Sequence, residues 1–304
     1  MTQQQRQALD ELLRHGPLDV GGDVAEQRKI FHEMISSVPL PDDVSTTRGE
    51  LGGVPVVTVQ TPNPADPATV IFYLHGGAYA LGSAPDSVGL AADISRRARA
   101  KAVSIDYRLA PEHPFPAAVD DALAAYGALL EEGVPASSVA FVGESAGGGL
   151  TVATLLAIKD NGLPRPACAA VFSPWADLTV SGASATGKAD LDPALTPGAL
   201  RTRARDYLGD RDPATPLASP VFADLTDLPP LLIQVGSHEI LLDDAVRLAA
   251  RAAADDVRVD LQVWPQVPHV FQGFAALLDD ADHALNAAAA FLNRNWENQT
   301  SPRG

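Results

Sequence analysis

The 304-residue chain has almost no cysteine, little positive charge and no long apolar run, and each shortage excludes a class of protein. Its single cysteine, Cys168, can form no intrachain disulfide and lies in an apolar run, so we expect a small buried side chain. With 22 lysines and arginines against 38 aspartates and glutamates, the net charge is −16. Nucleic acid and anionic membranes would repel such a chain and are not expected as partners. No stretch approaches the ~18 uninterrupted apolar residues of a membrane-spanning helix, so no integral membrane association is expected.

The start of the chain is polar, and its first six residues are followed by no apolar segment of the kind that a secretory signal contains. We therefore expect a cytoplasmic protein. With 46% hydrophobic residues, the chain suits one large globular domain with room for a small appendage. The composition leaves a homodimer open.

Along the chain, two helices precede a regular alternation of strands and helices. The helices are predicted at residues 3–15 and 24–35, where apolar residues recur at helical spacing. Further on, apolar runs predict strands at 54–59, 70–74, 102–105, 139–142, 169–172, 231–235 and 257–263. Helical patterns lie between or after them at 86–100, 117–132, 149–159, 197–207, 243–254 and 281–293. This alternation indicates an α/β fold with a mainly parallel sheet covered on both faces. The small, polar, glycine-rich segment 181–192 is expected to be a mobile loop or an insertion.

The most informative stretch is Gly143-Glu144-Ser145-Ala146-Gly147, which has the pattern G-x-S-x-G. It lies between a predicted strand and a predicted helix, which is the context of a nucleophile elbow. Glycines permit the tight turn, and the following helix start brings N–H groups and a positive dipole end to the serine. We therefore predict that Ser145 is a nucleophile. The alternative is a glycine-rich turn that holds an ordinary serine.

A second glycine-rich loop, His75-Gly76-Gly77-Ala78, directly follows the predicted strand 70–74. Acyl transfer needs preorganised N–H donors for the oxyanion, and such a loop together with the residue after the nucleophile supplies them. We assign Gly76, Gly77, Ala78 and Ala146 as candidate donors. The alternative is a tight turn without a catalytic role.

These motifs and their order resemble those of the hormone-sensitive-lipase family of α/β hydrolases, bacterial esterases and lipases with an H-G-G-G loop and a G-[DE]-S-A-G elbow. The matching segments are residues 75–78, 106–112 with 114–118, 143–147, 173–178 and 229–233. The resemblance covers about residues 40–295. It implies an α/β-hydrolase fold with an eight-stranded, mostly parallel sheet and a helical cap built partly from the N-terminal helices.

The expected domain organisation follows from this resemblance. Residues 1–45 would form part of the cap, and residues 46–297 the catalytic domain. A further cap contribution is expected from about residues 181–212, and residues 298–304 would be a disordered tail.

The chain departs from the family pattern at three places. The loop ends in Ala78 where many members have glycine, and members that hydrolyse bulky tertiary-alcohol esters also tolerate alanine there. The acid segment D-P-L-x-D reads Glu239-Ile240-Leu241-Leu242-Asp243, so Glu239 matches the catalytic acid. The histidine is followed by Val-Phe instead of the common Gly-Phe.

The predicted triad is Ser145, Glu239 and His269, in the order serine, acid, histidine that this fold uses. His269 would act as general base and then as general acid, and the carboxylate would orient the imidazole and stabilise the imidazolium. Asp243 and Asp244 remain alternatives for the acid. Asp243 also suits a helix N-cap.

Other polar residues have simpler expected roles. His75 is expected to brace the oxyanion loop, Arg108 to pair with a carboxylate and Glu112 to order the proline-rich loop, while Trp175 is structural or lines the pocket. No histidines have a metal-ligand spacing such as H-E-x-x-H. We expect no metal and no cofactor.

The sequence therefore predicts a serine carboxylesterase that acts on a small-molecule ester through an acyl-enzyme. The resemblance favours short acyl chains. Lactones or acetylated small metabolites are also open as substrates, and so is deacetylase or amidase activity at the same site. The rivals are a non-catalytic small-molecule receptor, whose relatives lack a working histidine, and a peptidase, which usually has a propeller or a long insertion.

Overall fold

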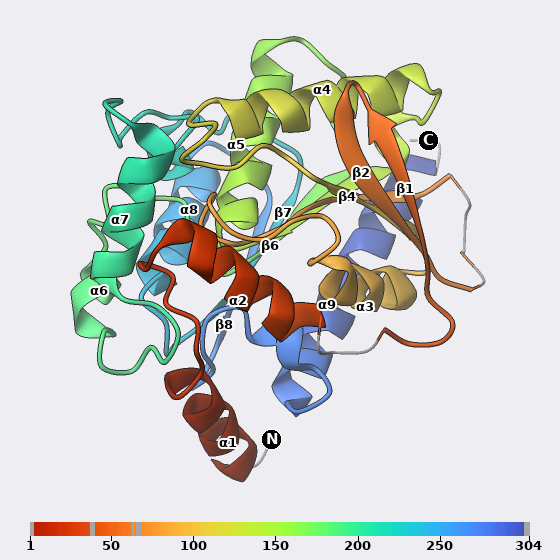
Figure 1. Cartoon of the computed structure of the whole chain (residues 1–304). Coiled ribbons are helices and arrows are strands. Elements are labelled where there is room, and N and C mark those ends of the chain that lie inside the picture. Colours follow the sequence, from red (N-terminus) through yellow and green to blue (C-terminus); the bar gives the residue numbers. More distant parts are fainter. Residues whose placement is uncertain (1–2, 37–39, 63, 65–67, 301–304) are drawn as a thin grey trace.

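The computed structural model describes residues 3–36, 40–62, 64 and 68–300, and its centre is one eight-stranded sheet in the order β1-β2-β4-β3-β5-β6-β7-β8 (Figure 1). The strands are β1 Ser45–Leu51, β2 Val54–Gln60, β3 Val70–Leu74, β4 Lys101–Ile105, β5 Val139–Glu144, β6 Cys168–Phe172, β7 Leu231–Gly236 and β8 Val259–Trp264. Strands β3 to β8 are parallel to one another, while β2 pairs antiparallel with both β1 and β4. The predicted α/β fold with an eight-stranded, mostly parallel sheet is confirmed.

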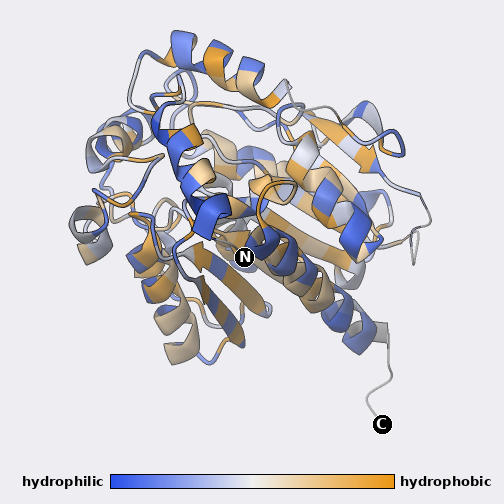
Figure 2. Cartoon of the chain, turned by 90° about the horizontal axis from the view of Figure 1, so that it is seen from below, coloured by the Kyte–Doolittle hydropathy of each residue, from blue (hydrophilic) through white to orange (hydrophobic). Residues whose placement is uncertain are grey.

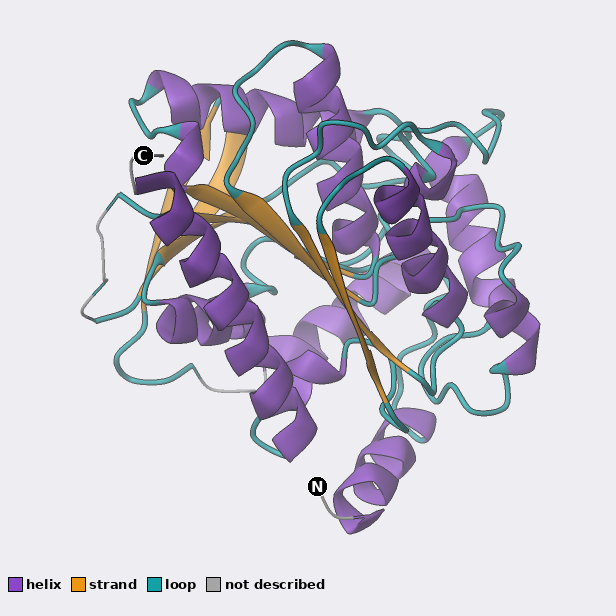
Figure 3. Ribbon diagram, turned by 180° about the vertical axis from the view of Figure 1, so that it is seen from behind, coloured by secondary structure: helices purple, strands orange, loops and turns teal. Residues whose placement is uncertain are grey.

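Helices cover both faces of this sheet (Figure 3). They are α1 Gln3–Arg14, α2 Val24–Ser36, α3 Val88–Ala98, α4 Ala117–Glu131, α5 Ala146–Asp160, α6 Ala183–Gly187, α7 Pro197–Leu208, α8 Leu242–Ala254 and α9 Asp279–Thr300. One large core contains side chains of α4, α5 and α8, while α3 and α9 pack into a second core on the opposite face. Strands β3, β6 and β7 are buried along their whole length, and β5 is buried up to its last residue, which explains their continuous apolar sequences. Figure 2 shows the same division, with apolar strands inside helices of mixed character.

Strand β1 was not predicted from the sequence. In β1, all residues but Leu51 are exposed, so the strand has no apolar alternation to reveal it. It forms by pairing with β2 across a turn at Gly52 and Gly53, both of which have positive φ. A glycine-glycine pair at such a turn is typical of a tight hairpin.

Three segment boundaries also differ from expectation. Residues 181–192, expected to be a mobile loop or an insertion, contain α6, and Ser184, Ala185 and Asp192 are buried there. Helix α5 begins at Ala146, directly after the nucleophile candidate. Helix α9 reaches residue 300, three residues into the expected tail, because Trp296 is buried and anchors its last turns. The rest of the tail, 301–304, lies outside the described residues.

The N-terminal helices lie apart from the sheet. Figures 1 and 3 both show α1 projecting from the body of the molecule. Helix α2 is held to the body by Arg28, whose guanidinium donates to the carbonyl oxygens of Ala80 (2.8 Å) and Ala110 (2.9 Å). Within the described ranges, no helix is both long and apolar enough to cross a membrane.

Candidate active site

The nucleophile elbow is the sharp turn between β5 and α5. Ser145 stands alone between the last strand residue and the first helical residue, with φ 55° and ψ −122°. Such a conformation is strained for a residue with a side chain and is typical of functional sites. A Cβ atom at Gly143 would lie 2.3 Å from the Gly147 carbonyl oxygen, and one at Gly147 would lie 2.0 Å from the Leu74 oxygen. Only glycine fits at these two positions, which explains the G-x-S-x-G pattern.

A chain of short polar contacts joins Ser145, His269 and Glu239. The Ser145 Oγ lies 2.9 Å from His269 Nε2, and His269 Nδ1 lies 2.8 Å from Glu239 Oε2. Because an ionised carboxylate only accepts hydrogen bonds, Nδ1 carries the ring proton and Nε2 accepts from the serine hydroxyl. The Glu239 side chain has no exposed surface, and that of His269 is 9% exposed.

The other carboxylate oxygen of Glu239 is also occupied. Its Oε1 accepts from the Gly236 N–H (2.6 Å) and from the Ser173 hydroxyl (2.8 Å). Ser173 in turn accepts from the backbone N–H of Val270, next to His269 (3.0 Å). Ser173 therefore bridges the acid and the histidine loop, a role that the sequence analysis did not assign. Its signal was its place at the carboxyl end of a parallel strand, where the sites of such sheets gather.

The two alternative acids are engaged elsewhere. Asp243 Oδ2 accepts from the N–H of Ser184 (2.9 Å), and Asp244 Oδ2 accepts from the N–H groups of Ala176 (2.9 Å) and Asp177 (2.8 Å). Burial and the nearby Asp177 carboxylate raise the pKa of Asp244 well above its usual value. The N-cap role of Asp243 is wrong, because α8 begins at residue 242 and Asp243 lies inside its first turn.

One of the four predicted oxyanion donors is already used. The N–H of Gly76 donates to Glu144 Oε1 at 2.7 Å, so assigning Gly76 as an oxyanion donor is wrong. The carboxylate of the elbow competes for this N–H because it projects back onto the loop. The remaining candidates, Gly77, Ala78 and Ala146, have no acceptor for their N–H groups among the described residues.

The carbonyl groups of the same loop are fixed in orientation. The Tyr107 hydroxyl donates to the His75 oxygen (2.6 Å), His75 Nδ1 donates to the Gly76 oxygen (2.7 Å), and the N–H of Leu81 donates to the Gly77 oxygen (2.8 Å). Since each carbonyl is held, the N–H groups that follow in the same peptide planes are held too. A Cβ atom at Gly77 would lie 2.1 Å from the Leu81 oxygen, so this position requires glycine.

His75 holds the loop in the way predicted for it. Its ring stacks on Tyr107 with centroids 4.2 Å apart, and burial lowers the pKa of the imidazole. Neutral His75 has its proton on Nδ1, which leaves Nε2 as a buried acceptor with no partner in the described part of the chain.

Glu144 connects the elbow to the oxyanion loop and to β3. Besides Gly76, it accepts from the Tyr73 hydroxyl at 2.5 Å. Burial raises the pKa of Glu144 to about 7, against the lowering effect of these two hydrogen bonds. Burial therefore disfavours the ionised form of Glu144, and the hydrogen bonds from Tyr73 and Gly76 offset part of this effect.

Two further expectations concern residues outside the site. Arg108 pairs with Asp121 through Nη2 and Oδ1 at 2.7 Å, which confirms its structural role. Glu112 pairs instead with Arg28 of α2 at 2.7 Å, and this hydrogen bond lowers the pKa of its carboxyl to about 2. Glu112 therefore ties the proline-rich loop to the N-terminal helices.

Two buried side chains have packing roles. Trp175 has no exposed surface, and its Nε1 donates to the Asp177 oxygen at 3.2 Å, so it is structural. Cys168 is buried as predicted, and burial raises the pKa of its thiol. Over the described residues, no group of three or more histidine, cysteine, aspartate or glutamate side chains could hold a metal ion.

Known proteins are similar to this chain in sequence and in fold. Residues 71–273 match the family model described as the alpha/beta hydrolase fold. An acetyl-hydrolase of Streptomyces hygroscopicus is 47% identical over 222 residues, which cover 73% of this chain and 74% of the relative. An esterase of Acinetobacter venetianus is 37% identical over 228 residues and covers 75% of each chain. The crystal structure of an esterase from the bacterial hormone-sensitive lipase family superposes with a TM-score of 0.94 at 40% identity, covering 97% of this chain and 99% of that chain.

The chain belongs to the hormone-sensitive-lipase family of α/β hydrolases. With relatives named esterase and carboxylesterase, it is a carboxylic ester hydrolase. The enzyme is therefore an esterase, as the sequence predicted.

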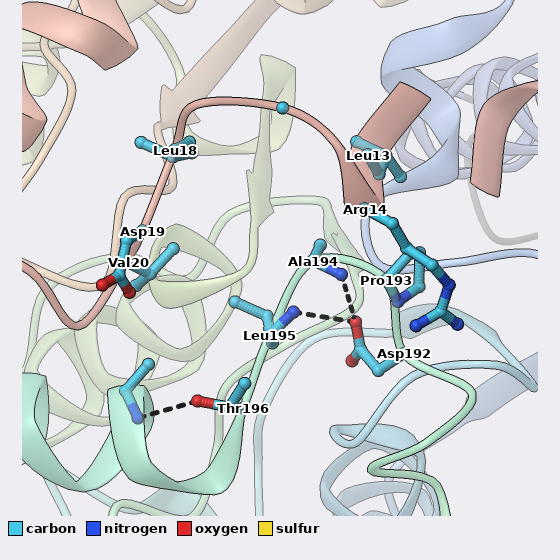
Figure 4. A pocket seen from close by; sticks show the side chains of 12 residues that line it. Leu13, Arg14, Leu18, Asp19, Val20, Asp192, Pro193, Ala194, Leu195 and Thr196 are labelled. Carbon is cyan, nitrogen blue, oxygen red and sulfur yellow. Dashed lines mark hydrogen bonds between the residues drawn. The ribbon is translucent and has the colours of Figure 1, made fainter. Parts of the chain in front are cut away.

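A cavity of about 230 Å³ in the esterase lies between the N-terminal segment and the segment that precedes α7 (Figure 4). Leu13, Leu18 and Val20 line it from the first side, and Asp192 and Leu195 from the second. The Asp192 carboxylate also accepts from the N–H of Ile240, the residue after Glu239, at 2.8 Å. This cavity thus links the N-terminal helices with the neighbourhood of the site.

Proposed function

We propose that the esterase is a serine carboxylesterase in which Ser145 is the nucleophile, His269 the proton carrier and Glu239 the acid. The observation that carries this proposal is the continuous hydrogen-bond chain from Ser145 Oγ through both His269 nitrogens to Glu239. Nucleophile and base within hydrogen-bond reach, with the base oriented by a third group, is the recognisable pattern of such catalysis.

In the acylation step, Ser145 Oγ attacks the ester carbonyl carbon while His269 Nε2 takes the hydroxyl proton. The tetrahedral intermediate collapses by breaking the carbon–oxygen bond to the alcohol, which leaves with that proton. In the second step, His269 takes a proton from water, the resulting hydroxide attacks the acyl-enzyme, and the carboxylic acid leaves as Ser145 regains its proton. Glu239 stays ionised and stabilises the imidazolium in both steps.

The oxyanion is stabilised by Gly77, Ala78 and Ala146. Support comes from their unbonded N–H groups and from the fixed carbonyls of residues 75–77. Ala146 also begins α5, whose dipole places partial positive charge beside the developing oxyanion. Donors that are already oriented cost no reorganisation when the charge forms.

The substrates are esters with short acyl chains. The relative from Streptomyces hygroscopicus is named an acetyl-hydrolase, and the structure of another relative, 38% identical, was obtained after soaking with p-nitrophenyl butyrate. The name acetyl-hydrolase does not specify the atom that carries the acetyl group, so removal of an acetyl group from nitrogen is a second candidate activity. Comparing hydrolysis of O-acetyl and N-acetyl forms of one compound would separate the two.

Helices α1 and α2, together with the segment from α6 to α7, form a cap over this site. The support is that Arg28 of α2 bonds to the oxygen of Ala80, two residues after the oxyanion loop, and that Arg203 of α7 donates to the Gly22 oxygen (3.1 Å). The two parts of the cap therefore touch each other as well as the catalytic domain.

A phosphonate label tests the nucleophile assignment. Wild-type enzyme treated with a p-nitrophenyl phosphonate ester should gain one adduct in intact-protein mass, because an activated serine displaces p-nitrophenol. The Ser145→Ala variant should gain none, and His269→Ala should react slowly. An adduct of equal rate on folded Ser145→Ala would reject Ser145 as nucleophile.

A further inference from the structure

Two side chains of the segment 181–195 form hydrogen bonds with the backbone immediately after Glu239. The N–H of Ile240 donates to Asp192 Oδ2 at 2.8 Å, and the Ser184 hydroxyl donates to the Ile240 oxygen at 2.7 Å. Asp192 and Ser184 are only 4% and 6% exposed. The first bond fixes the peptide group that Glu239 shares with Ile240, and the second fixes the next peptide group.

The Asp192 carboxylate is itself held rigidly. Its Oδ1 accepts from the N–H groups of Ala194 and Leu195, both at 2.9 Å (Figure 4), and its own N–H donates to the Lys188 oxygen at 2.9 Å. Burial raises the pKa of Asp192, and the hydrogen bonds from three N–H groups oppose this effect. These bonds also define where the second carboxylate oxygen points. The position of the Asp192 carboxylate is therefore set by its own segment and does not depend on its bond to Ile240.

The same segment is tied to the N-terminal helix. Arg14, in the last turn of α1, donates to the backbone oxygens of Asp190 and Leu191, both at 3.1 Å. Gly182 lies so close to Asp243 that a Cβ atom there would be 2.8 Å from the Asp243 Cβ. The segment is therefore packed against the acid loop at one end and against α1 at the other.

Placement of the acid is sensitive to this backbone. Glu239 has to keep Oε2 2.8 Å from His269 Nδ1 while Oε1 serves Gly236 and Ser173. If the Asp192 acceptor were lost, the buried Ile240 N–H would be unsatisfied, which costs about 1–3 kcal/mol and is relieved by moving the backbone. Such a movement would be transmitted directly to the Glu239 side chain.

We propose that Asp192 is a positioning residue for the catalytic acid, through which the segment 181–195 of the cap sets the orientation of Glu239. The inference rests on the proposed role of Glu239 as the acid of the triad.

The test is kcat and KM of Asp192→Asn with p-nitrophenyl acetate, with Asp190→Asn as matched control. Both changes remove one negative charge from the same segment, but the Asp190 side chain is exposed. Asp192→Asn should lower kcat about tenfold to a hundredfold, the effect of a small misplacement of a catalytic group, and change KM less than about twofold. Asp190→Asn should stay within about twofold of wild type in both constants.

A double-mutant cycle with Glu239→Gln identifies the route of the effect. If Asp192 acts through Glu239, Asp192→Asn should lower kcat by less than about twofold in the Glu239→Gln background. An equal fall in both backgrounds would overturn the inference, since Asp192 would then act on His269 directly or on the fold. Wild-type kcat in Glu239→Gln alone would instead reject the proposed acid, and the inference with it.

Ser184→Ala provides the second variant in case Asp192→Asn does not fold. It removes the hydrogen bond to the Ile240 oxygen, and the one that Ser184 Oγ accepts from the Asp243 N–H (2.9 Å), without adding a buried donor. Its kcat should fall several-fold, and this fall should disappear in the Glu239→Gln background. An unchanged kcat, or a fall that persists in that background, would overturn the inference.

Discussion

At the scale of single residues, the site shows which side chains the sequence can identify. Ser145 and His269 were found from motif and chain order, and the structure brings their side chains together at 2.9 Å. The error at Gly76 has a physical cause that no pattern reveals, because its N–H is taken by a side chain 68 residues away. Ser173 was missed for a similar reason, since its role depends on a contact with Glu239 across the sheet edge.

The acid of the triad is tested by exchanging carboxylates for amides. Glu239→Gln should lower kcat by about 10²–10⁴-fold, because an amide neither fixes the tautomer of His269 nor stabilises its charged form. Asp243→Asn should change kcat only a few-fold, since Asp243 bonds to the Ser184 backbone. Steady-state kinetics on both purified variants checks the order, and the reverse order would move the acid to Asp243.

The raised pKa of Glu144 predicts a pH-dependent stability difference. A carboxyl whose pKa rises from 4.5 to about 7 on folding contributes stability below pH ~4.5, and this contribution is lost as the pH rises through about 7. Compared with Glu144→Gln, which has no such titration, wild type should lose about 2 kcal/mol of unfolding free energy between pH 5 and pH 8. Urea unfolding of both proteins at several pH values measures this difference. A difference that does not vary with pH would show that Glu144 keeps an ordinary pKa.

At the scale of elements, the buried strands could be predicted from the sequence, and the exposed edge strand β1 could not. Strands β3 to β7 were found because burial on both faces requires continuous apolar residues. Strand β1 was missed because an exposed edge strand needs no such residues and is defined by its partner. Segment 181–192 is small, polar and glycine-rich, which predicted a mobile loop or an insertion. Its residues are instead held by bonds to distant groups such as the Ile240 backbone, which sequence spacing does not show.

Helix α2 offers a prediction about substrate preference. Arg28→Ala removes two bonds to the oxygens of Ala80 and Ala110 and the surface pair with Glu112. Because α2 would be held less firmly, the site should admit longer acyl chains. The ratio of kcat/KM for p-nitrophenyl hexanoate to that for p-nitrophenyl acetate should therefore rise several-fold, which corresponds to about 1 kcal/mol of binding energy in the acyl pocket. An acyl-length series on wild type and variant measures this ratio.

Arg251→Ala is the matched control for that series. Arg251 also bonds to a backbone oxygen, that of Ala223 (2.9 Å), and pairs with Asp255 (3.0 Å), but it lies in the last turn of α8. Its acyl-length profile should equal that of wild type. If both variants or neither shift the ratio, α2 has no specific role in selecting the acyl chain.

At the scale of the whole molecule, the acidic composition allowed classes of partner to be excluded but carried no information on the fold. The α/β alternation indicated the sheet, and the resemblance of five ordered motifs supplied its number of strands. Composition could not show which aspartates and glutamates form ion pairs with arginines. Within the described chain, arginines pair mostly with carboxylates at exposed or part-buried positions, as Arg96 does with Asp43 and Arg97 with Asp282.

This excess of negative charge predicts that salt stabilises the esterase. A net charge of −16 destabilises the compact state by self-repulsion, which added salt screens. Exposed ion pairs are weakened at the same time, but each is worth only about 0–1 kcal/mol, so the repulsion should dominate. Raising sodium chloride from 0.05 to 1 M at pH 8 should therefore raise the Tm by about 2 °C or more, the shift that ~1 kcal/mol gives in a chain of this size. The same titration near pH 5, where the net charge approaches zero, should give a much smaller rise. A Tm that falls with salt at pH 8 would mean that the arginine–carboxylate ion pairs stabilise the fold by more than the repulsion among the acidic residues destabilises it.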